Sequence, residues 1–374
     1  MTALRLLTMG LAVPVCLAAQ TAKSSPPWQY GASVDVGYLH DSNYPTNHLF
    51  RSRGTTFHVN SLQLNMSTIY LAKQAADDSR WGMQLTLQAG KDAEVFGFSA
   101  TAPSIDGYKV LRHLGPSNVS YLARVGTGLT LQGGIFSSFV GYDGLYAKDN
   151  LNYTRPWGAD FTPYLMLGVN AQYAFSPAVA GAFFVVNGYW HLAHANDVPS
   201  VGGQIAYKPA ARITVKHTGL FGPHQSNTSL WFWRSLIDNT VEWKGDRLTV
   251  AFEYFVGAER VDSTGHPYAL WMSSQLPMRL SLSPQISLTL RPEVYWDRDG
   301  RTTLYRQTVK ANTTTLEFRR PYGGGANVIV RLEHRIDDSR GADGGFFVGN
   351  AGLTPTQNLL IAAVLATFDG SRPR

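Results

Sequence analysis

The chain has 374 residues, of which 44% are hydrophobic and only 16% are charged, with a formal net charge of +6 and a mean hydropathy of −0.13. The charged fraction is low for a soluble protein, yet no stretch beyond residue 22 approaches the ~20 apolar residues that a membrane-spanning helix needs. The Lys and Arg residues are dispersed along the chain, often near acids, whereas a nucleic-acid-binding surface requires them to cluster. These features exclude a helical membrane protein and a nucleic-acid-binding protein.

The N-terminus has the form of a secretory signal, with one early basic residue, an apolar run over 6–18 and small residues just after it. We expect residues 1–19 to be the signal peptide, with the cut falling between residues 18 and 23, and 20–374 to form a single domain. The alternative interpretation of the run is a short buried helix. The only cysteine, Cys16, lies inside the signal. We therefore expect no disulfide, no cysteine-bound metal and no thiol catalysis in the mature chain.

The rest of the chain alternates apolar and polar residues in short segments. In 285–296 one face carries Ile286, Leu288 and Leu290, and the other carries Arg291 and Glu293. This period of two is typical of a β-strand with one apolar and one wet face. Sixteen candidate strands cover, in chain order, residues 29–40, 57–71, 81–90, 120–124, 129–136, 164–175, 179–192, 201–207, 212–220, 236–244, 248–256, 268–282, 285–296, 309–320, 327–336 and 358–368.

The second candidate strand, 57–71, has an apparent apolar face formed by Leu62, Leu64, Met66 and Tyr70. Very short turns alternate with longer connections throughout the chain, and Gly323 to Gly325 form one of the tight turns. Short turns on one rim and long loops on the other are the layout of outer-membrane barrels. Because a sheet in lipid cannot leave backbone groups unpaired, it must close. We therefore expect an all-β, antiparallel, up-and-down transmembrane barrel of about 14–16 strands, with an inward-folded or capping loop.

The last candidate strand ends at Phe368, six residues before the C-terminus, with Leu360, Ala362, Val364 and Ala366 on the same face. A near-terminal aromatic residue on an amphipathic strand resembles the signal that the outer-membrane assembly machinery reads. We expect Phe368 to be that assembly signal. The alternative is that the segment is an ordinary core strand.

If the apolar faces point outward, six acidic and six basic side chains line the lumen. These opposite charges either create a transverse field in a water-filled pore or pair with one another along the wall, and they predict no ion selectivity. The candidate lumen residues are Asp35, Arg212, Lys216, Asp238, Glu242, Lys244, Glu253, Arg291, Glu293, Arg331, Glu333 and Arg335.

A long, aromatic and polar connection, 137–162, lies between two candidate strands. A loop folded into a lumen needs polar groups to meet water and aromatic groups to anchor it on the wall. We expect this connection to narrow the pore, with an outer loop packed over the rim as the alternative. Its candidate constriction residues are Tyr142, Asp143, Lys148, Asp149, Asn150, Tyr153 and Arg155.

The same region resembles the OmpL-like family of β-barrel porins. The matching stretches are 134–143, 149–155 and 164–168, in which a glycine-flanked strand end is followed by an aromatic and Arg-containing stretch and a further strand. Ile135 stands where that family usually has a basic residue, and Asp143 where it usually has a glutamate. The resemblance implies an outer-membrane channel and names no solute.

Signs of enzymatic chemistry are weak. His191 and His194 form an H-x-x-H pair, but residues i and i+3 of a strand face opposite sides, and the glutamate of a zinc protease is missing. His217 and His334 fall on apolar faces, where an outer-membrane lipase would need a His, although an interfacial histidine explains them equally. We expect no enzyme, no cofactor and no metal.

We therefore predict an outer-membrane porin, a passive diffusion channel for small hydrophilic solutes or ions. The rival interpretation is a surface barrel with a structural or adhesive role whose lumen is plugged by 91–116 or 137–162, and a lipid-acting barrel enzyme is the third. The partners that we expect are outer-membrane lipid and lipopolysaccharide, the barrel-assembly machinery and, as an option left open, further copies of the chain.

Overall fold

The structure is a computed structural model of the chain and describes residues 28–97, 108–189, 192, 198–224, 231–262 and 267–372. The predicted signal peptide, its cleavage site and the pair His191 and His194 lie outside these residues. The described chain forms one large antiparallel sheet and one small hairpin.

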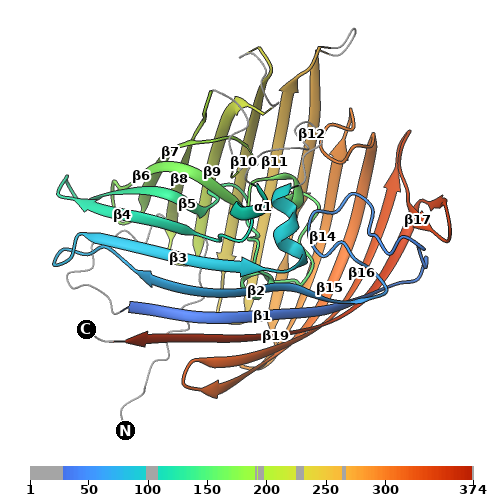
Figure 1. The fold of residues 1–374 in the computed structure, drawn as a ribbon, viewed down its shortest axis with the longest axis horizontal. Helices are drawn as coiled ribbons and strands as arrows, with labels where there is room; N and C mark the ends of the chain where they lie inside the picture. Colours follow the sequence, from blue (N-terminus) through green and yellow to red (C-terminus); the bar gives the residue numbers. More distant parts are fainter. Residues whose placement is uncertain are drawn as a thin grey trace.

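The large sheet closes on itself. Each strand pairs with its neighbour in sequence, and the last, β19, pairs with the first, β1, from Trp28 opposite Arg372 to Asp41 opposite Leu359 (Figure 1). Its strands are β1 (Trp28–Asp41), β2 (Leu62–Lys73), β3 (Trp81–Ala89), β4 (Ser117–Ala123), β5 (Leu129–Ser137), β6 (Leu165–Ala174), β7 (Val179–Val186), β8 (Ser200–Ala210), β9 (Ile213–Pro223), β10 (Trp233–Lys244), β11 (Leu248–Arg260), β12 (Tyr268–Gln275), β13 (Met278–Ser281), β14 (Ile286–Asp297), β15 (Gln307–Gly323), β16 (Ala326–Arg340) and β19 (Thr356–Arg372).

β12 and β13 are two parts of one strand, since both lie between β11 and β14. Pro277 separates them, and a proline cannot donate to the ladder. The 17 segments of the sheet therefore make a barrel of 16 strands. This confirms the predicted all-β barrel and each of the sixteen candidate strands, with shifts at the ends.

The two rims differ as predicted. Turns of a few residues join β6 to β7, β8 to β9, β10 to β11, β13 to β14 and β15 to β16 on the rim where β1 begins and β19 ends. The other rim carries the long connections. These hold the 3₁₀ helices η2 (Lys91–Gly97), η3 (Ala147–Asp149) and η4 (Ala159–Phe161), the helix α1 (Tyr108–Leu111), and the hairpin of β17 (Phe346–Val348) and β18 (Gly352–Thr354).

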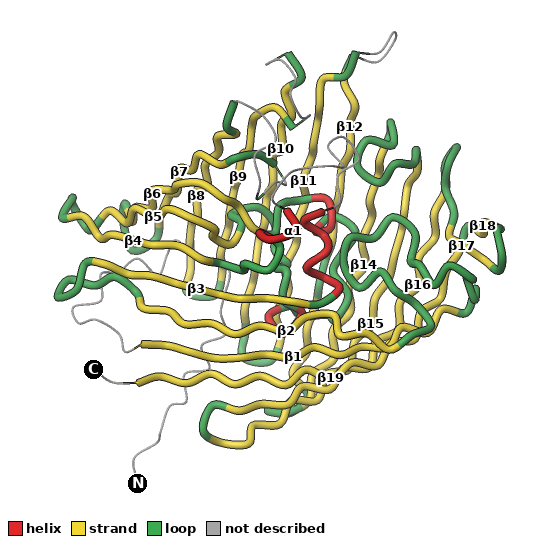
Figure 2. The backbone as a smooth tube through the Cα atoms, viewed as in Figure 1, coloured by secondary structure: helices red, strands yellow, loops and turns green. Residues whose placement is uncertain are grey.

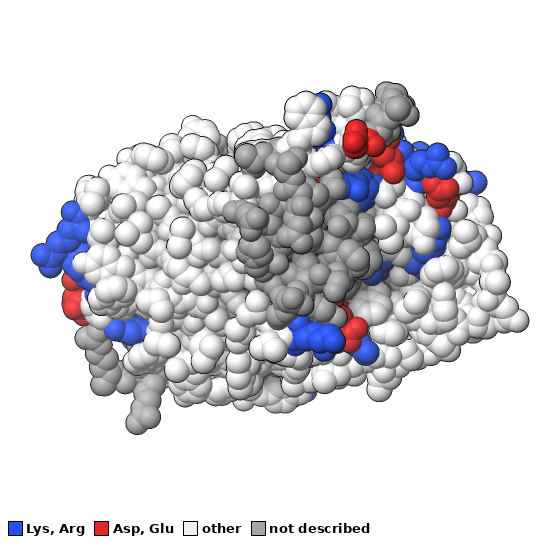
Figure 3. Space-filling view, turned by 45° about the horizontal axis from the view of Figure 1, so that its top comes forward, with Lys and Arg blue, Asp and Glu red and all other residues white. Residues whose placement is uncertain are grey.

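Apolar side chains cover the outside of the barrel. On β14, Ile286, Leu288 and Leu290 are each 38–39% exposed, whereas Arg291 and Glu293 on the opposite face are at most 4% exposed. Charged side chains gather at one tip and around the loops at the other, and a wide uncharged surface lies between them (Figure 3). Within the described part of the chain, no helix is long and apolar enough to span a membrane.

The face of β2 differs from the prediction. The pairing of β1 with β2 shifts where Asp35 opposes Met66 and Val36 opposes Leu64, so Asn65 is an extra, bulged residue. Because one inserted residue reverses the alternation, Met66 is buried inside while Ile69 and Leu71 take the outward, exposed positions. Met66 and Tyr70 therefore do not share a face with Leu62 and Leu64.

The core lies inside the barrel instead of between layers. We call residues 138–164, which connect β5 with β6, the inner segment. Figure 2 shows loop and helix inside the ring of strands. Every residue from 152 to 166 is buried.

Candidate functional site

The inner segment leaves β5 and crosses first to the wall formed by β7, β8 and β9. The ring of Phe139 stacks on Phe184 of β7 with the centroids 5.1 Å apart. The carbonyl of Phe139 accepts hydrogen bonds from Gln204 Nε2 at 2.6 Å and from the Thr218 hydroxyl at 3.1 Å. These contacts fix the start of the segment against the wall.

Backbone amides of the next residues bind carboxylates on β10 and β11. Gly141 N donates to Asp238 at 3.0 Å, and Tyr142 N donates to Glu253 at 3.0 Å. The Tyr142 hydroxyl donates to Glu242 at 2.9 Å. The wall carboxylates therefore satisfy amides that no secondary structure would satisfy.

Arg331 of β16 binds three backbone carbonyl groups in the middle of the inner segment. Its guanidinium donates to the oxygens of Ala147, Asn150 and Asn152 at 2.7–2.9 Å. Glu317 of β15 pairs with the same guanidinium at 2.7 Å. The planar guanidinium of arginine carries five donors and can contact all these oxygens at once, whereas the ammonium of a lysine is a compact point charge.

Tyr153 ties the segment to two parts of the wall at once. Its backbone N donates to Glu333 of β16 at 2.7 Å, and its hydroxyl donates to Asp35 of β1 at 2.8 Å. Asn65, the bulged residue of β2, donates to the same hydroxyl at 2.6 Å. Gly37 makes room for the ring, since a Cβ there would lie 2.4 Å from the Tyr153 oxygen.

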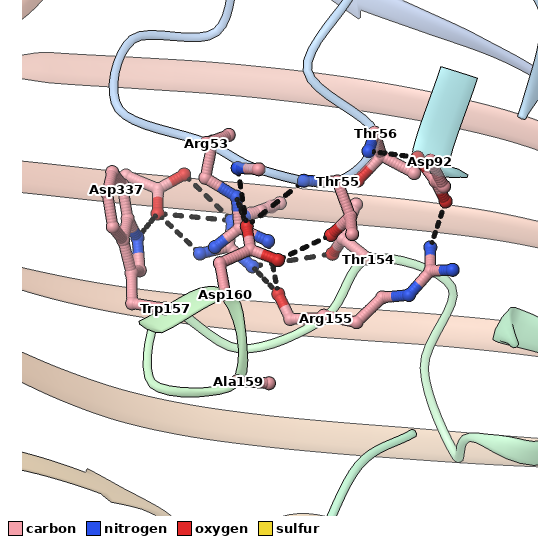
Figure 4. A network of polar contacts seen from close by, with 12 residues as sticks. Arg53, Thr55, Thr56, Asp92, Thr154, Arg155, Trp157, Ala159, Asp160 and Asp337 are labelled. Carbon is pink, nitrogen blue, oxygen red and sulfur yellow. Dashed lines mark hydrogen bonds and ion pairs between the residues drawn. The ribbon is translucent and has the colours of Figure 1, made fainter. Parts of the chain in front are cut away.

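A network of buried ion pairs joins the inner segment to two other loops (Figure 4). Arg155 lies 2.8 Å from Asp92 of η2, and Arg53, in the loop after β1, lies 3.0 Å from Asp160. All four side chains are fully buried. Asp160 also accepts from the Thr55 hydroxyl at 2.6 Å. Three loops that are distant in the sequence are thus joined in the lumen.

Trp157 anchors the returning part of the segment. Its backbone N donates to Glu293 of β14 at 2.5 Å, and its indole donates to Asp337 of β16 at 2.7 Å. Arg335 pairs with both carboxylates, at 3.0 Å and 2.7 Å. Because each charge has a partner, their burial does not leave an isolated charge in the lumen.

Burial also acts on the carboxyl groups of the loops. It raises the pKa of Asp143, while Arg291 and the hydrogen bond from Gln275 act in the opposite direction. Burial likewise raises the pKa of Asp92, against the opposing effect of Arg155. Protonation of these two groups is therefore easier than for an aspartate in water.

The structure places the predicted constriction residues in two groups. Asp143, Asn150, Tyr153 and Arg155 are buried, at 9, 6, 0 and 0% exposure. The side chains of Lys148 and Asp149 are 13% and 19% exposed and pair at 3.0 Å, and Tyr142 is half-buried. The second group lies on the accessible edge of the segment.

The predicted lumen residues also separate by position. Nine of the twelve face inward and bind the inner segment or one another, or lie in the same buried wall: Asp35, Asp238, Glu242, Glu253, Arg291, Glu293, Arg331, Glu333 and Arg335. Lys216 also lies on the inward side of β9, with Thr218, and is half-buried near the short-turn rim. Arg212 differs from the prediction, because it lies in the turn after β8, 53% exposed, and pairs with Asp246 at 2.8 Å. Lys244 is exposed at the end of β10, so it too lies at the rim and not deep in the lumen.

Four buried residues of the network escaped the sequence reasoning, namely Arg53, Asp92, Trp157 and Asp160. Trp157 and Asp160 lie inside the predicted connection, within the run of buried residues 152–166. Because every residue of this run is buried, its sequence shows no alternation that would single out these two. Arg53 and Asp92 lie in other loops, and only the folded chain brings them to the inner segment. No group of three or more His, Cys, Asp or Glu side chains among the described residues is arranged to hold a metal ion.

Comparisons with known proteins agree with this architecture. The model of the family described as "Putative beta-barrel porin-2, OmpL-like" matches residues 27–368. No curated protein matches the sequence. The anion-selective porin from Comamonas acidovorans is similar in structure, with a TM-score of 0.57 and 10% identity over 92% of this chain and 100% of that one. OprB from Pseudomonas putida is similar with a TM-score of 0.54 and 9% identity, over 93% of this chain and 94% of that one. OmpT from Vibrio cholerae is similar with a TM-score of 0.53 and 9% identity, over 91% of this chain and 96% of that one. Because the identity is so low, these similarities show a shared fold and nothing more specific.

Proposed function

The chain belongs to the OmpL-like family of β-barrel porins, and we propose that its inner segment sets the size of the solutes that pass through the lumen. The protein is a porin of the bacterial outer membrane. The observation that carries the proposal is the position of the segment, whose hydrogen bonds reach β8, β10, β11, β14, β16 and β1 across the lumen. A solute must pass beside it.

We propose that the accessible edge of the segment meets the solute. From residue 141 to 148 buried and half-buried residues alternate, with Tyr142, Gly144, Tyr146 and Lys148 half-buried. The half-buried side of this stretch borders water, while the hydroxyls of Tyr142 and Tyr146 reach the wall at Glu242 of β10 and Gln88 of β3. Tyr142, Lys148 and Asp149 offer a hydroxyl and two charges to a hydrophilic solute. Asp143, Asn150, Tyr153 and Arg155 have the structural task of holding that edge in place.

The buried wall charges support the same division of roles. Arg291, Arg331 and Arg335 are 0% exposed, and each donates to a backbone carbonyl of the inner segment. A charge that water cannot reach does not select ions directly. We propose that these residues position the constriction, and that selectivity depends on half-buried groups nearer the short-turn rim, including Lys216 and Glu242.

The second candidate function is a surface barrel whose lumen is plugged. One specific observation favours it, because the buried run from 152 to 166 fills the middle of the lumen in the described part of the chain. The two candidates differ in whether the accessible edge of the inner segment borders a continuous water path.

Family and fold indicate a channel without catalysis. A lipid hydrolase on the outer wall would need a hydroxyl nucleophile beside its histidine. The outward neighbours of His217 along and across the strands are Val215, Gly219, Ile205 and Asn239, and none of these carries a hydroxyl. His334 lies opposite Thr314 of β15, and no hydrogen bond joins these two side chains in the described part of the chain. Lipid hydrolysis abolished by His217→Ala or by His334→Ala would contradict this assignment.

One partner assignment goes further than the family. We propose that the barrel-assembly machinery reads Phe368, whose outward ring is 38% exposed and lies 6.0 Å from the Tyr30 ring. Phe368→Ala is expected to lower the amount of folded protein in the outer membrane. Leu365→Ala, a buried change on the same strand, is the control for general destabilisation. Equal assembly of Phe368→Ala and the unaltered protein would refute the assignment.

Liposome swelling tests the proposed channel. Vesicles that contain the purified protein should swell in small sugars and swell progressively less as the sugar grows. Replacement of both Tyr142 and Lys148 by Ala, on the accessible edge, should shift this size limit upward. Lys310→Ala, an exposed outward change on β15, should leave it unchanged. No swelling in any sugar would instead favour the plugged barrel.

A further inference from the structure

A cavity lies at the long-loop rim, between the loop after β1, the loop after β14 and the hairpin of β17 and β18. Its volume is about 320 Å³, and its lining includes Thr46, Asn47, Arg51, Tyr305, Phe347 and Asn350. None of its lining residues belongs to the inner segment. Cavities that take small molecules begin at ~300 Å³, so this one has room for a single sugar-sized ring.

Arg51 is the charged residue of the cavity, and it forms no ion pair with an acidic side chain among the described residues. It is 7% exposed. Its Nη1 donates to the backbone carbonyls of Asp343 and Gly345 at 2.9 Å and 2.7 Å. The carboxylate of Asp343 pairs with Arg306 instead, at 2.7 Å. Because a buried cation without a counter-ion is costly, this position favours the binding of an anion.

One edge of the Arg51 guanidinium is left unused. The buried Nε has no hydrogen-bond partner among the described residues. The central carbon of the guanidinium lies 3.4 Å from the centroid of the Tyr305 ring, and this contact holds the group in place. The edge formed by Nε and Nη2 can bind a carboxylate through two parallel hydrogen bonds.

The other lining groups suit a hydroxylated ring. The Thr46 hydroxyl donates to the carbonyl of Gly349 at 3.1 Å. The side-chain oxygen of Asn47 accepts from the backbone N of Leu49 at 3.0 Å. The lone pairs of the Thr46 hydroxyl and the NH2 of Asn47 can therefore meet the hydroxyl groups of a ligand. Phe347 is half-buried and adds an apolar surface.

Contacts with the interior of the barrel hold the cavity in shape. Phe50, next to Arg51, packs against Trp157 of the inner segment with the ring centroids 5.8 Å apart, and against Phe346 at 6.1 Å. The backbone N of Thr46 also donates to Gly349, which joins the loop after β1 to the hairpin. A cavity whose walls are already fixed loses little freedom when a ligand binds.

We propose that this cavity binds a small hydroxylated monocarboxylate, a sugar acid of one ring, at the outer entrance of the barrel. The carboxylate takes the unused edge of Arg51, and the hydroxyl groups meet Thr46 and Asn47. A carboxylate carries one negative charge, which one guanidinium neutralises, whereas a phosphate monoester carries nearly two. The proposal goes beyond the constriction, and its test measures binding and does not depend on conduction.

Calorimetric titration of the purified, folded protein tests the site directly. Galacturonate should bind more tightly than galactose, which differs from it at C6 alone, and more tightly than galactose 6-phosphate. Arg51→Gln should weaken the binding of galacturonate about tenfold or more, because a charge-assisted hydrogen bond is lost. Arg340→Gln, an exposed change on the same rim outside the cavity lining, should leave it unchanged. Galactose or its phosphate bound as tightly as galacturonate, or unchanged binding by Arg51→Gln, would overturn the proposal.

A second pair of variants tests the site without changing the contacts of Arg51, in case Arg51→Gln does not fold. Ala351 is an exposed lining residue in the turn between β17 and β18. Ala351→Asp places a negative charge at the cavity and should weaken the binding of galacturonate by repulsion. Ala351→Asn has nearly the same size without the charge and should retain most of the binding. Equal affinity of these two variants for galacturonate would refute the role of charge at this site.

Discussion

The buried residues of the lumen act as matched pairs. Arg155 and Asp92 are both fully buried and lie 2.8 Å apart, and neither has water to replace its partner. Removing one member of such a pair costs about 3–5 kcal/mol, because a buried charge remains without compensation. An exposed pair such as Arg306 and Asp343 is screened and contributes little.

We predict that Arg155→Ala loosens the inner segment without unfolding the barrel. At ~1.4 kcal/mol per tenfold change, amide hydrogen exchange in residues 138–164 should become a hundredfold faster or more. Arg306→Ala should leave this exchange unchanged. Arg155→Met combined with Asp92→Asn should recover part of the protection, since no charge is left unpaired. Unchanged exchange in Arg155→Ala would show that the pair does not hold the segment.

Asp143 leads to a prediction about pH. Burial raises the pKa of this group in the folded state, so the docked segment binds its proton at a pH where the undocked segment does not. The docked state therefore gains stability as the pH falls through the raised pKa toward the ordinary value, and loses it as the pH rises.

Protection of the inner segment from hydrogen exchange, corrected for the intrinsic rate, should increase on mild acidification. Asp143→Asn, which keeps an oxygen for the Gln275 amide at 2.7 Å, should reduce this pH dependence to the part that Asp92 contributes and strengthen docking at neutral pH. Loosening of the segment on acidification, equal in both proteins, would contradict the assignment of the effect to Asp143.

At the scale of elements, the strands carry the fold and the inner segment is docked into it. β5 and β6 pair directly from Leu129 opposite Tyr173 to Ser137 opposite Leu165, so the ladder is complete without the connection. The segment binds the wall through side chains of other strands. The barrel therefore does not depend on the segment for closure.

We predict that replacing residues 141–161 by a short Gly-Ser linker yields a folded barrel. The protein should keep its heat-modifiable mobility in gels and its β-sheet circular dichroism. Some loss of stability is expected, because Arg331, Arg335 and Glu333 lose their partners in the segment. Shortening of residues 345–354, the hairpin of β17 and β18, should be less costly. Failure of the linker protein to fold in either assay would show that the segment nucleates the barrel.

The alternation of residues was sufficient to predict the strands, but not each of their faces. On β14 the predicted outward and inward sides are the observed ones, because no irregularity interrupts the pattern. On β2 a single bulged residue, Asn65, reverses the sides after it. The sequence contains no local signal for this bulge, and its partner, Tyr153, is 88 residues away.

The whole molecule is a closed 16-strand barrel whose lumen is occupied by loops from one rim. Period-two segments and the alternation of short and long connections predicted closure, the two rims and the connection that folds inward. The ion pairs Arg53–Asp160 and Arg155–Asp92 were beyond prediction, because they join loops by contacts across the lumen. Nor did the tally of lumen charges reveal that most of them bind the inner segment and are closed to water.

Single-channel conductance in a planar bilayer tests the central claim most directly, with the unaltered protein and the linker protein measured side by side. A constriction made by the inner segment predicts small, stable steps for the unaltered protein and several-fold larger steps when residues 141–161 are replaced. Equal conductance of the two proteins would show that the segment does not limit the pore. A folded linker protein without any conductance would contradict the account of the protein as a channel.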